Sequence, residues 1–438
     1  MTNLFRQATC CIVGGGPAGM MLGYLLARRN ISVIILEKHR DFNRDFRGDT
    51  VHPSTLEVLS ELGILDDFLK LPHQKVESVE GIVGDFSFQG PDFRHLKTRC
   101  RFIAMMPQWD FLTFLAGRAR QFPSFELLME HQGIDLVTHG EEIVGVTVTS
   151  PEGVGEVRAD LVVACDGRHS IMRKAAGLEL QELGVPIDVL WFRISRRGND
   201  PEQLLGNVNY GRALILINRG DYLQAGLIIQ KGSFEEIKQA GLLSFQNEMR
   251  RIAPYLGERT SEIQNWDQVK LLSVQINRLK RWYRRRFLCI GDAAHAMSPA
   301  GGVGINLAIQ DAVATANLLA EPLLQRTVTE NSLSRVQRRR EFPTRVTQAL
   351  QVNAHRGFEK VFHSNKGVRA PWQLKLISRL PGFSRLLARV IGIGVRPEHI
   401  GDRASRAIEP PSWIPLAAGA AAVSAIAATY IVRRRRVS

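Results

Sequence analysis

The sequence predicts an α/β fold built on a Rossmann-like dinucleotide-binding unit. A short apolar run, Cys10 to Val13, leads directly into a glycine-rich turn at 14–19. A helical segment follows, and a second apolar run, 33–36, ends at the acid Glu37. A strand, a glycine turn, a helix and a strand in this order form the G-x-G-x-x-G unit in the context that it requires.

Each residue type in this unit has a physical reason. Gly14 permits the tight turn, Gly16 lets a pyrophosphate approach the backbone, and Gly19 lets the helix pack closely on the strand. The helix N-terminus points its unpaired N–H groups at the phosphates. Glu37 lies where a carboxylate accepts hydrogen bonds from the adenosine ribose hydroxyls.

Composition bounds the class of protein. With 438 residues, the chain is long enough for two folded units that share a core, or for one domain with a large insertion. The net charge of +14 favours anionic cofactors and anionic lipid surfaces. Because no aromatic-interleaved basic stripe accompanies the charge, nucleic acid is not expected as a partner. No metal-ligand spacing occurs, so no metal site is predicted.

The cysteines and the N-terminus indicate the compartment. The five cysteines are an odd number without C-x-x-C spacing, which is typical of buried, reduced thiols in a cytoplasmic protein. The glycine turn begins too early for a charged-then-apolar leader to precede it. We therefore expect a cytoplasmic location rather than secretion.

After Glu37 the chain enters an Arg-rich loop and then a helix. Arg47 is either a solvated loop charge or a group that contacts the middle of the cofactor. Ser54 or Thr55 is the predicted N-cap of a helix with leucines at helical spacing through Leu65.

The middle of the chain reads as two β-rich regions. Residues 76–106 alternate apolar and polar, which predicts a few antiparallel strands. Residues 125–165 predict three strands, the last of which ends at Asp166 and Gly167. Residues 185–275 predict further strands and a helix at about 234–252.

The chain then returns to the first domain. A buried strand at 286–290 ends at Gly291 and Asp292, and glycines at 301, 302 and 304 precede a long Ala/Leu helix that runs to about Leu324. A helix N-terminus rich in glycine offers free N–H groups and a positive dipole end, which would stabilise a negatively charged ligand. A basic helical stretch at 333–366 and a looser helical tail at 371–394 complete the folded part.

Three glycine-bearing turns thus follow apolar strands, at 14–19, 166–167 and 291–292. Together with Arg47-Gly48-Asp49-Thr50 and the motif Gly291-Asp292-Ala293-Ala294-His295 followed by Pro299, they resemble the flavoprotein aromatic hydroxylases. These are single-component FAD monooxygenases of the para-hydroxybenzoate hydroxylase and ubiquinone-ring hydroxylase type. The resemblance spans about residues 8–345. Cys165 stands where the family often has alanine, and Val303 where glutamine is common.

The resemblance implies a GR2-type flavoprotein: a Rossmann-like FAD-binding domain, an inserted β-rich substrate domain and a helical C-terminal tail. The FAD-binding domain would comprise 1–75, 100–184 and 276–345, and the substrate domain 76–99 and 185–275. A helical region at 346–408 and a membrane-anchor helix at 413–432 would follow.

The resemblance also implies where FAD lies. Gly14, Gly16, Gly19 and Glu37 would hold its ADP half, and Asp292 its ribityl or pyrophosphate region. Asp166 and Gly167 would serve both FAD and the approach of the nicotinamide. The full set of expected cofactor-binding residues is Gly14, Gly15, Gly16, Pro17, Ala18, Gly19, Glu37, Lys38, Arg47, Gln108, Asp166, Gly167, Asp292, Pro299, Gly301, Gly302, Val303, Gly304, Ile305 and Asn306.

The implied function is an FAD-dependent monooxygenase. NAD(P)H would be a transient reductant, because the sequence carries no second G-x-G-x-x-G. Oxygen would pass through a flavin C4a-hydroperoxide to a small hydrophobic substrate, aromatic or polyprenyl-like. No catalytic side chain is assigned, and His295 is more often structural than catalytic in such a turn. The alternatives are another FAD-dependent reaction on this scaffold, reduction or halogenation, and a non-catalytic, membrane-tethered flavoprotein.

The C-terminus suggests a membrane contact. Trp413 to Val432 contains no charged residue, and Arg433 to Arg436 follow at once. Twenty uncharged residues are the minimum for a membrane span, with aromatic residues near both ends. A span, a helix lying on the membrane surface, and a disordered or core-packed tail all stay open. The expected location is therefore cytoplasmic, with membrane association through 413–436.

Overall fold

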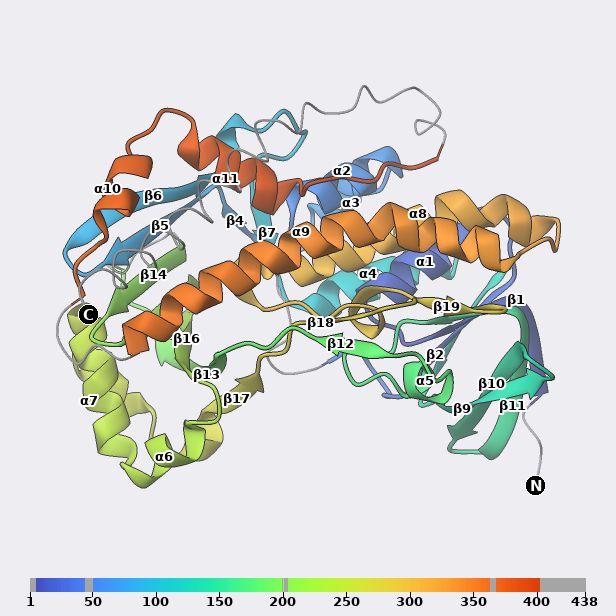
Figure 1. The fold of residues 1–438 in the computed structure, drawn as a ribbon, viewed down its shortest axis with the longest axis horizontal. Coiled ribbons are helices and arrows are strands. Elements are labelled where there is room, and N and C mark those ends of the chain that lie inside the picture. Colours follow the sequence, from blue (N-terminus) through green and yellow to red (C-terminus); the bar gives the residue numbers. More distant parts are fainter. Residues whose placement is uncertain (1–4, 44–49, 199, 201–203, 363–367, 402–438) are drawn as a thin grey trace, which may run out of the picture.

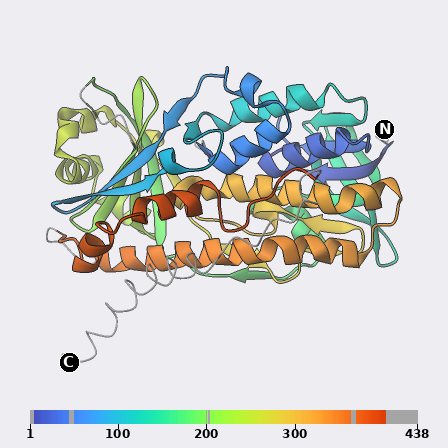
Figure 2. The same ribbon diagram turned by 90° about the horizontal axis from the view of Figure 1, so that it is seen from above.

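The computed structural model describes residues 5–43, 50–198, 200, 204–362 and 368–401. The two largest β-sheets lie at opposite ends of an elongated molecule, and the longest helix runs past both of them (Figure 1). Seen from above, this helix forms one long edge of the molecule beside a second long helix (Figure 2). The two long helices therefore connect the part of the molecule that contains the first sheet to the part that contains the second.

The first sheet has eight strands and contains the glycine-rich unit. Five of its strands are parallel, in the order β20, β11, β1, β2 and β8. These strands carry continuous apolar runs because both faces of a parallel sheet are covered, and all five residues of β2 are buried. The eight strands are β1 (Phe5–Val13), β2 (Val33–Glu37), β8 (Phe125–Met129), β9 (Gln132–His139), β10 (Glu142–Ser150), β11 (Gly153–Ala164), β19 (Tyr283–Arg284) and β20 (Phe287–Cys289).

Long helices cover this sheet and join it to the second one. Helix α1 packs between α4 and α8, and α9 packs along α8. Their bounds are α1 (Pro17–Ala27), α4 (Gln108–Ala119), α8 (Val303–Leu324) and α9 (Glu330–Phe362). Among the described residues, one helical stretch, Ala300–Leu324, is long and apolar enough to cross a membrane, but 78% of its apolar window is buried inside the protein. It is the core helix that its Ala/Leu composition predicts.

The second sheet has seven strands drawn from two separate parts of the chain. Residues 78–92 and 187–273 meet where β14 pairs in parallel with β5. One face packs on α6 and α7, and the opposite face meets α9. In order across the sheet, the strands are β17 (Lys270–Ser273), β13 (Ile187–Ser195), β16 (Tyr222–Gln230), β15 (Arg212–Asn218), β14 (Leu204–Asn209), β5 (Ser78–Val83) and β6 (Phe86–Asp92).

Short elements connect the two halves. The C-terminal helix α11 packs on β6, and it runs above the second sheet in Figure 1. The remaining elements are β3 (Thr50–Val51), β4 (Gln74–Val76), β7 (Ile103–Met105), β12 (Leu180–Glu182), β18 (Asn277–Leu279), α2 (Pro53–Glu61), α3 (Leu65–Phe68), α5 (Ile171–Ala175), α6 (Phe234–Gln239), α7 (Leu242–Ile252), α10 (Trp372–Ile377), α11 (Phe383–Gly392), and the 3₁₀ turns η1 (Phe93–His95), η2 (Pro254–Glu262), η3 (Trp266–Gln268), η4 (Gly291–Ala293) and η5 (Ala300–Gly302).

Three local predictions were wrong. The helix predicted at 234–252 is two helices, because Gly241 adopts a left-handed φ of 89° between them. Residues 125–165 contain four strands rather than three, since β9 was missed. Neither Ser54 nor Thr55 is the N-cap of α2, which begins at Pro53 because proline is favoured in the first helical turn.

Sheet membership follows the proposed division into FAD-binding and substrate domains, which itself stays a prediction. The boundary proposed at 345/346 falls inside α9, a single helix of 33 residues. Arg47 and the segment 413–436 lie outside the described residues.

Candidate functional site

The site is built from three strand-to-helix turns that meet at one edge of the first sheet. β20, β11 and β1 are parallel neighbours, so their carboxyl ends lie together. A Cβ atom on Gly14 would lie 2.4 Å from the carbonyl oxygen of Cys165, in the second turn. A Cβ on Gly291, in the third turn, would lie 3.2 Å from the Cβ of Ala18 in the first. Ligands of open α/β sheets bind at this edge.

The three glycines of the first turn differ in what surrounds them. Gly14 has a left-handed φ of 108° and no room for a side chain, because the Cys165 carbonyl covers it. Gly19 sits where a Cβ would lie 2.0 Å from the Gly14 carbonyl oxygen. Gly16 has ordinary extended backbone and nothing within 4 Å of its Cβ position. Two glycines are therefore needed for packing, whereas the third leaves open space at the helix N-terminus, which fits a pyrophosphate.

Glu37 closes the first turn at the end of β2. Its Oε2 atom accepts a hydrogen bond from the Gly15 N–H at 2.9 Å, and Oε1 accepts one from the His39 N–H at 3.1 Å. The side chain is only 3% exposed. The carboxylate is thereby held against the glycine turn.

Asp166 carries a buried acceptor that fits a ligand. Its Oδ2 atom accepts a hydrogen bond from the Met172 N–H at 3.1 Å. Its Oδ1 atom is buried and has no hydrogen-bond partner among the described residues. Burial raises the pKa of this carboxyl above its ordinary value. Buried polar atoms in native proteins have partners, so a donor supplied by a bound molecule would complete this site.

The second and third turns are tied together by arginines. The Arg168 guanidinium donates to Asp292 Oδ2 at 3.4 Å. The buried Arg173 side chain donates to the carbonyl oxygens of Ala293 at 2.9 Å and Arg168 at 3.0 Å. Asp292 remains partly exposed, with 31% of its side chain accessible. The Asp292 carboxylate is therefore oriented by Arg168 and is still accessible to a ligand.

The N-terminus of α8 needs its glycines. Gly301 and Gly302 have left-handed φ angles of 79° and 64°. A Cβ on Gly302 would lie 2.4 Å from Oγ1 of Thr50, whose hydroxyl donates to the Gly302 carbonyl at 3.0 Å. The helix that follows packs on the third strand-end turn, since a Cβ on Gly291 would lie 3.3 Å from the Cβ of Ala308.

Asn306, in the first turns of α8, is held by α2. The hydroxyls of Ser54 and Thr55 both donate to its Oδ1 atom, at 2.6 and 2.9 Å. All three side chains are buried. These two hydroxyls therefore fix α8 against α2.

Helix α9 positions the loop that precedes α8. Gln351 accepts a hydrogen bond from the Ser298 N–H at 3.1 Å and donates to the carbonyl oxygens of Ser298 and Ala300, both at 3.0 Å. Gln348 donates to the Ala296 carbonyl at 3.2 Å. These glutamines were not predicted, since nothing in the sequence of a basic helix indicates which backbone groups its side chains contact.

A buried ionic network supports the third turn from behind. Asp311 accepts hydrogen bonds from the Gly291 N–H at 3.0 Å, from His295 Nε2 at 2.6 Å and from Arg340 Nε at 2.9 Å. Arg340 also pairs with Glu398 at 3.3 Å. Burial alone would raise the pKa of Asp311, but His295 and Arg340 bring it below its ordinary value. His295 is 1% exposed and serves this network, which agrees with a structural role.

This network had one signal in the sequence. Asp311 is an acid in the middle of an otherwise apolar helical run. A charge in such a position is almost always paired when buried. The sequence could therefore have indicated an ion pair there, but not its partners, which come from residues up to 29 positions away along the chain.

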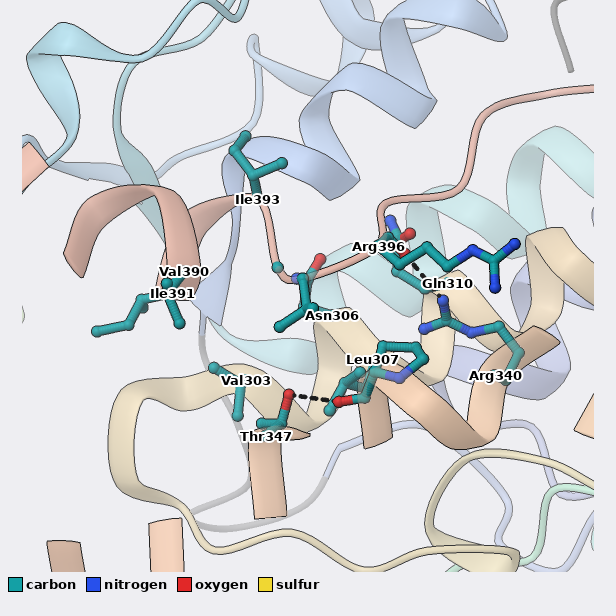
Figure 3. A pocket seen from close by; sticks show the side chains of 13 residues that line it. Val303, Asn306, Leu307, Gln310, Arg340, Thr347, Val390, Ile391, Ile393 and Arg396 are labelled. Atoms are coloured by element: carbon teal, nitrogen blue, oxygen red, sulfur yellow. Dashed lines mark hydrogen bonds between the residues drawn. The ribbon is translucent and has the colours of Figure 1, made fainter. Parts of the chain in front are cut away.

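A small cavity lies between α8, α9 and the segment 390–396. Figure 3 shows Val303 and Asn306 of α8, Arg340 of α9 and Arg396 around it, with Arg340 donating to the Arg396 carbonyl at 3.1 Å. Its volume of about 20 Å³ accommodates about one water molecule. It is too small for an aromatic substrate, so we do not assign the substrate to it.

The remaining predicted residues have various environments. Lys38 is exposed just after β2, and Gln108 is the first residue of α4 and is half-buried. Pro17 and Ala18 are the first two residues of α1. Gly167 follows Asp166 in the second turn. Pro299, Val303, Gly304 and Ile305 all lie at the start of α8 or just before it. Arg47 alone of the predicted set is not described.

The family is decided by comparison with known proteins. The FAD binding domain family matches residues 7–350, most of the chain and all three strand-end turns. The chain belongs to this family. It is an FAD-dependent monooxygenase, in agreement with the resemblance to the flavoprotein aromatic hydroxylases.

Individual relatives agree with this family. The chain is 31% identical over 392 residues to 6-methylpretetramide 4-monooxygenase of Streptomyces rimosus, covering 87% of this chain and 91% of that enzyme. The crystal structure of P. aeruginosa PqsL in complex with 2-aminobenzoylacetate covers 82% of this chain and 100% of PqsL, with a TM-score of 0.70 at 19% identity. The flavin-dependent brominase Bmp2 covers 99% of this chain and 100% of its own, with a TM-score of 0.72 at 15% identity. The last two likenesses show a shared fold.

Proposed function

We propose that this FAD-dependent monooxygenase hydroxylates a hydrophobic, polycyclic aromatic substrate. The relative with 31% identity is named for a pretetramide substrate, and it aligns over nearly its whole length. An aromatic substrate is therefore favoured over a polyprenyl-like one. When bound, FAD accepts electrons from NAD(P)H and activates O₂ for the transfer of one oxygen atom.

The protein's own residues bind and orient the cofactor. The open backbone at Gly16 and the N-terminus of α1 would receive the pyrophosphate, and Glu37 would accept hydrogen bonds from the ribose hydroxyls. Asp292 would hold the ribityl region, and the start of α8 would stabilise negative charge on the reduced ring system. Asp166, with its unpaired Oδ1, would accept a hydrogen bond from FAD or from the nicotinamide.

The observation that carries this proposal is the convergence of three turns around one open glycine. Gly14 lies against the second turn and Gly291 against the first, yet Gly16 faces open space. The open position at Gly16 leaves room for a pyrophosphate at the N-terminus of α1. The test is reconstitution with FAD, followed by NAD(P)H oxidation with and without polycyclic phenols. Substrate-dependent oxidation with a hydroxylated product supports the proposal, and a halogenated product, formed only with halide, would favour the halogenase alternative.

We further propose a cytoplasmic enzyme that associates with membranes through 413–436. The support is in the sequence, where an uncharged run of twenty residues precedes four arginines. Near an anionic membrane each basic residue contributes about 1 kcal/mol. Full-length protein should therefore pellet with membranes more completely than a chain that ends at Pro410, and both chains should keep their FAD. Equal pelleting of the two would remove the anchor.

A further inference from the structure

We propose that α10 forms a second, separate membrane-contact surface, which docks on anionic lipid. The surface consists of Trp372, Leu376 and Leu380, and we call it the α10 surface. These side chains are 61%, 55% and 53% exposed. Their spacing of four places them along one side of the helix and the turn that continues it. None of them is among the residues that would hold FAD.

The α10 surface differs from ordinary exposed apolar residues. Single exposed hydrophobic side chains are normal on soluble proteins, but three large ones in a row indicate an interaction site. The inner side of the same segment is well anchored. Lys375 lies over the Phe86 ring at 5.4 Å, and in α11 Gly392 packs on Phe93, where a Cβ would lie 3.1 Å away. The segment is thus fixed to β6 and η1, with its apolar row turned outward.

Charge identifies the partner as an anionic lipid surface. Residues 368–397 contain no acidic residue and six basic ones, of which Lys375 lies over the Phe86 ring; the six are Arg369, Lys375, Arg379, Arg385, Arg389 and Arg396. No ion pair within the described part of the chain includes any of the six. Elsewhere in the same part, arginines and lysines commonly pair with carboxylates, as Arg259 does with Asp200.

An apolar row containing tryptophan beside unpaired cations is the composition of helices that lie in the membrane interface. Tryptophan favours the headgroup level, and the basic side chains attract anionic headgroups. A symmetric dimer through this surface would bring the same basic segment against itself, because 368–397 contains no acidic residue. We therefore commit to lipid as the occupant. Because α11 packs on β6, docking would place the edge of the second sheet at the membrane, where hydrophobic substrates concentrate.

The test uses full-length, FAD-loaded protein and a local optical signal. Vesicles of phosphatidylcholine with phosphatidylglycerol are prepared with brominated acyl chains, which quench tryptophans at the interface. Trp372→Phe should remove part of the quenching, and Trp413→Phe reports separately on the tail. If Trp372→Phe leaves the quenching unchanged, the α10 surface does not touch lipid and the proposal is wrong.

A second measurement uses affinity. Leu376→Ser with Leu380→Ser should lower the partition coefficient on anionic vesicles by about tenfold. The matched control is Leu243→Ser, which removes a leucine that is 68% exposed on α7 and should leave partitioning unchanged. Replacing Arg379, Arg385 and Arg389 by alanine should weaken binding to anionic vesicles more than to pure phosphatidylcholine.

The outcomes separate the occupants and the proposals. Equal partitioning of the double variant and the control would overturn the α10 surface. A concentration-dependent dimer that the double variant abolishes, without vesicle binding, would also overturn it in favour of a second copy. Because none of these readouts depends on turnover, they do not change if the proposed substrate class is wrong.

Discussion

Gly16→Val tests the cofactor site with the sharpest separation between folding and binding. The backbone at Gly16 has φ of −75° and ψ of −175°, which valine adopts without strain, and no atom lies within 4 Å of its Cβ position. Losing a glycine N-cap is unfavourable by up to about 1 kcal/mol. Restricting the unfolded chain offsets this by about 0.4–1 kcal/mol. The apoprotein should therefore keep its stability within about 1 kcal/mol.

FAD binding should respond very differently. A valine side chain would occupy the space where the pyrophosphate meets the α1 N-terminus and would displace one or two charge-assisted hydrogen bonds. At about 1.5–3 kcal/mol each, the loss is about 3 kcal/mol, or roughly a hundredfold in Kd. The assays are chemical denaturation of the apoprotein and fluorescence titration with FAD.

Two matched variants complete this experiment. Gly117→Val adds the same side chain to an exposed glycine in α4, which also has nothing within 4 Å, and should bind FAD normally. Gly14→Ala should instead destabilise the fold, because its Cβ would lie 2.4 Å from the Cys165 carbonyl at a left-handed φ. A folded Gly16→Val protein with unchanged FAD affinity would refute the assignment of this turn to the pyrophosphate.

Three further predictions concern charge and pH. Asp292→Ala should weaken FAD by about 1–3 kcal/mol in the same titration, and an unchanged Kd would leave Asp292 only its pairing with Arg168. Asp166→Ala should slow flavin reduction by NAD(P)H in stopped flow far more than it lowers FAD content; equal loss of both, or of neither, would exclude a role in nicotinamide approach. Burial lowers the pKa of His52 and His355 to about 4 from an ordinary 6.5, so both stay neutral in the folded protein while the unfolded chain protonates. The free energy of unfolding should have its full value above about pH 6.5 and should decrease toward pH 4, by about 2 kcal/mol for each histidine at about pH 5. Urea denaturation that shows no decrease in this free energy between about pH 7.5 and pH 5 would contradict the prediction.

The sequence predicted the helices and strands that have a regular hydrophobic periodicity and end at recognisable turn residues. The strands 142–150 and 212–218 carry clear apolar patterns and lie within the regions 125–165 and 185–275, where strands were predicted. The helix at 234–252 looked continuous because its apolar spacing carries across Gly241, where the backbone in fact turns. Strand β9 was missed because most of its residues are not buried, so its apolar pattern is weak.

Local motifs predicted the candidate site, whereas the contacts that support it are non-local. The glycine turns could be read directly because each residue's role depends on its immediate neighbours. The hydrogen bonds from Ser54 and Thr55 to Asn306 join residues about 250 positions apart in the sequence, so the sequence could not predict them. For the same reason, the hydroxyls looked like helix caps, their commonest use. Asp311 carried a recognisable signal, but its partners Arg340 and His295 were fixed only by the fold.

The most direct test of the central claim follows oxygen from the gas into the product. FAD-reconstituted enzyme, NAD(P)H and a polycyclic phenol are incubated under oxygen-18 gas, and the product is analysed by mass spectrometry. An FAD-dependent monooxygenase predicts one labelled oxygen atom in the product and an absolute requirement for both FAD and NAD(P)H. A product labelled only from water, or one formed equally well without FAD, would contradict the account.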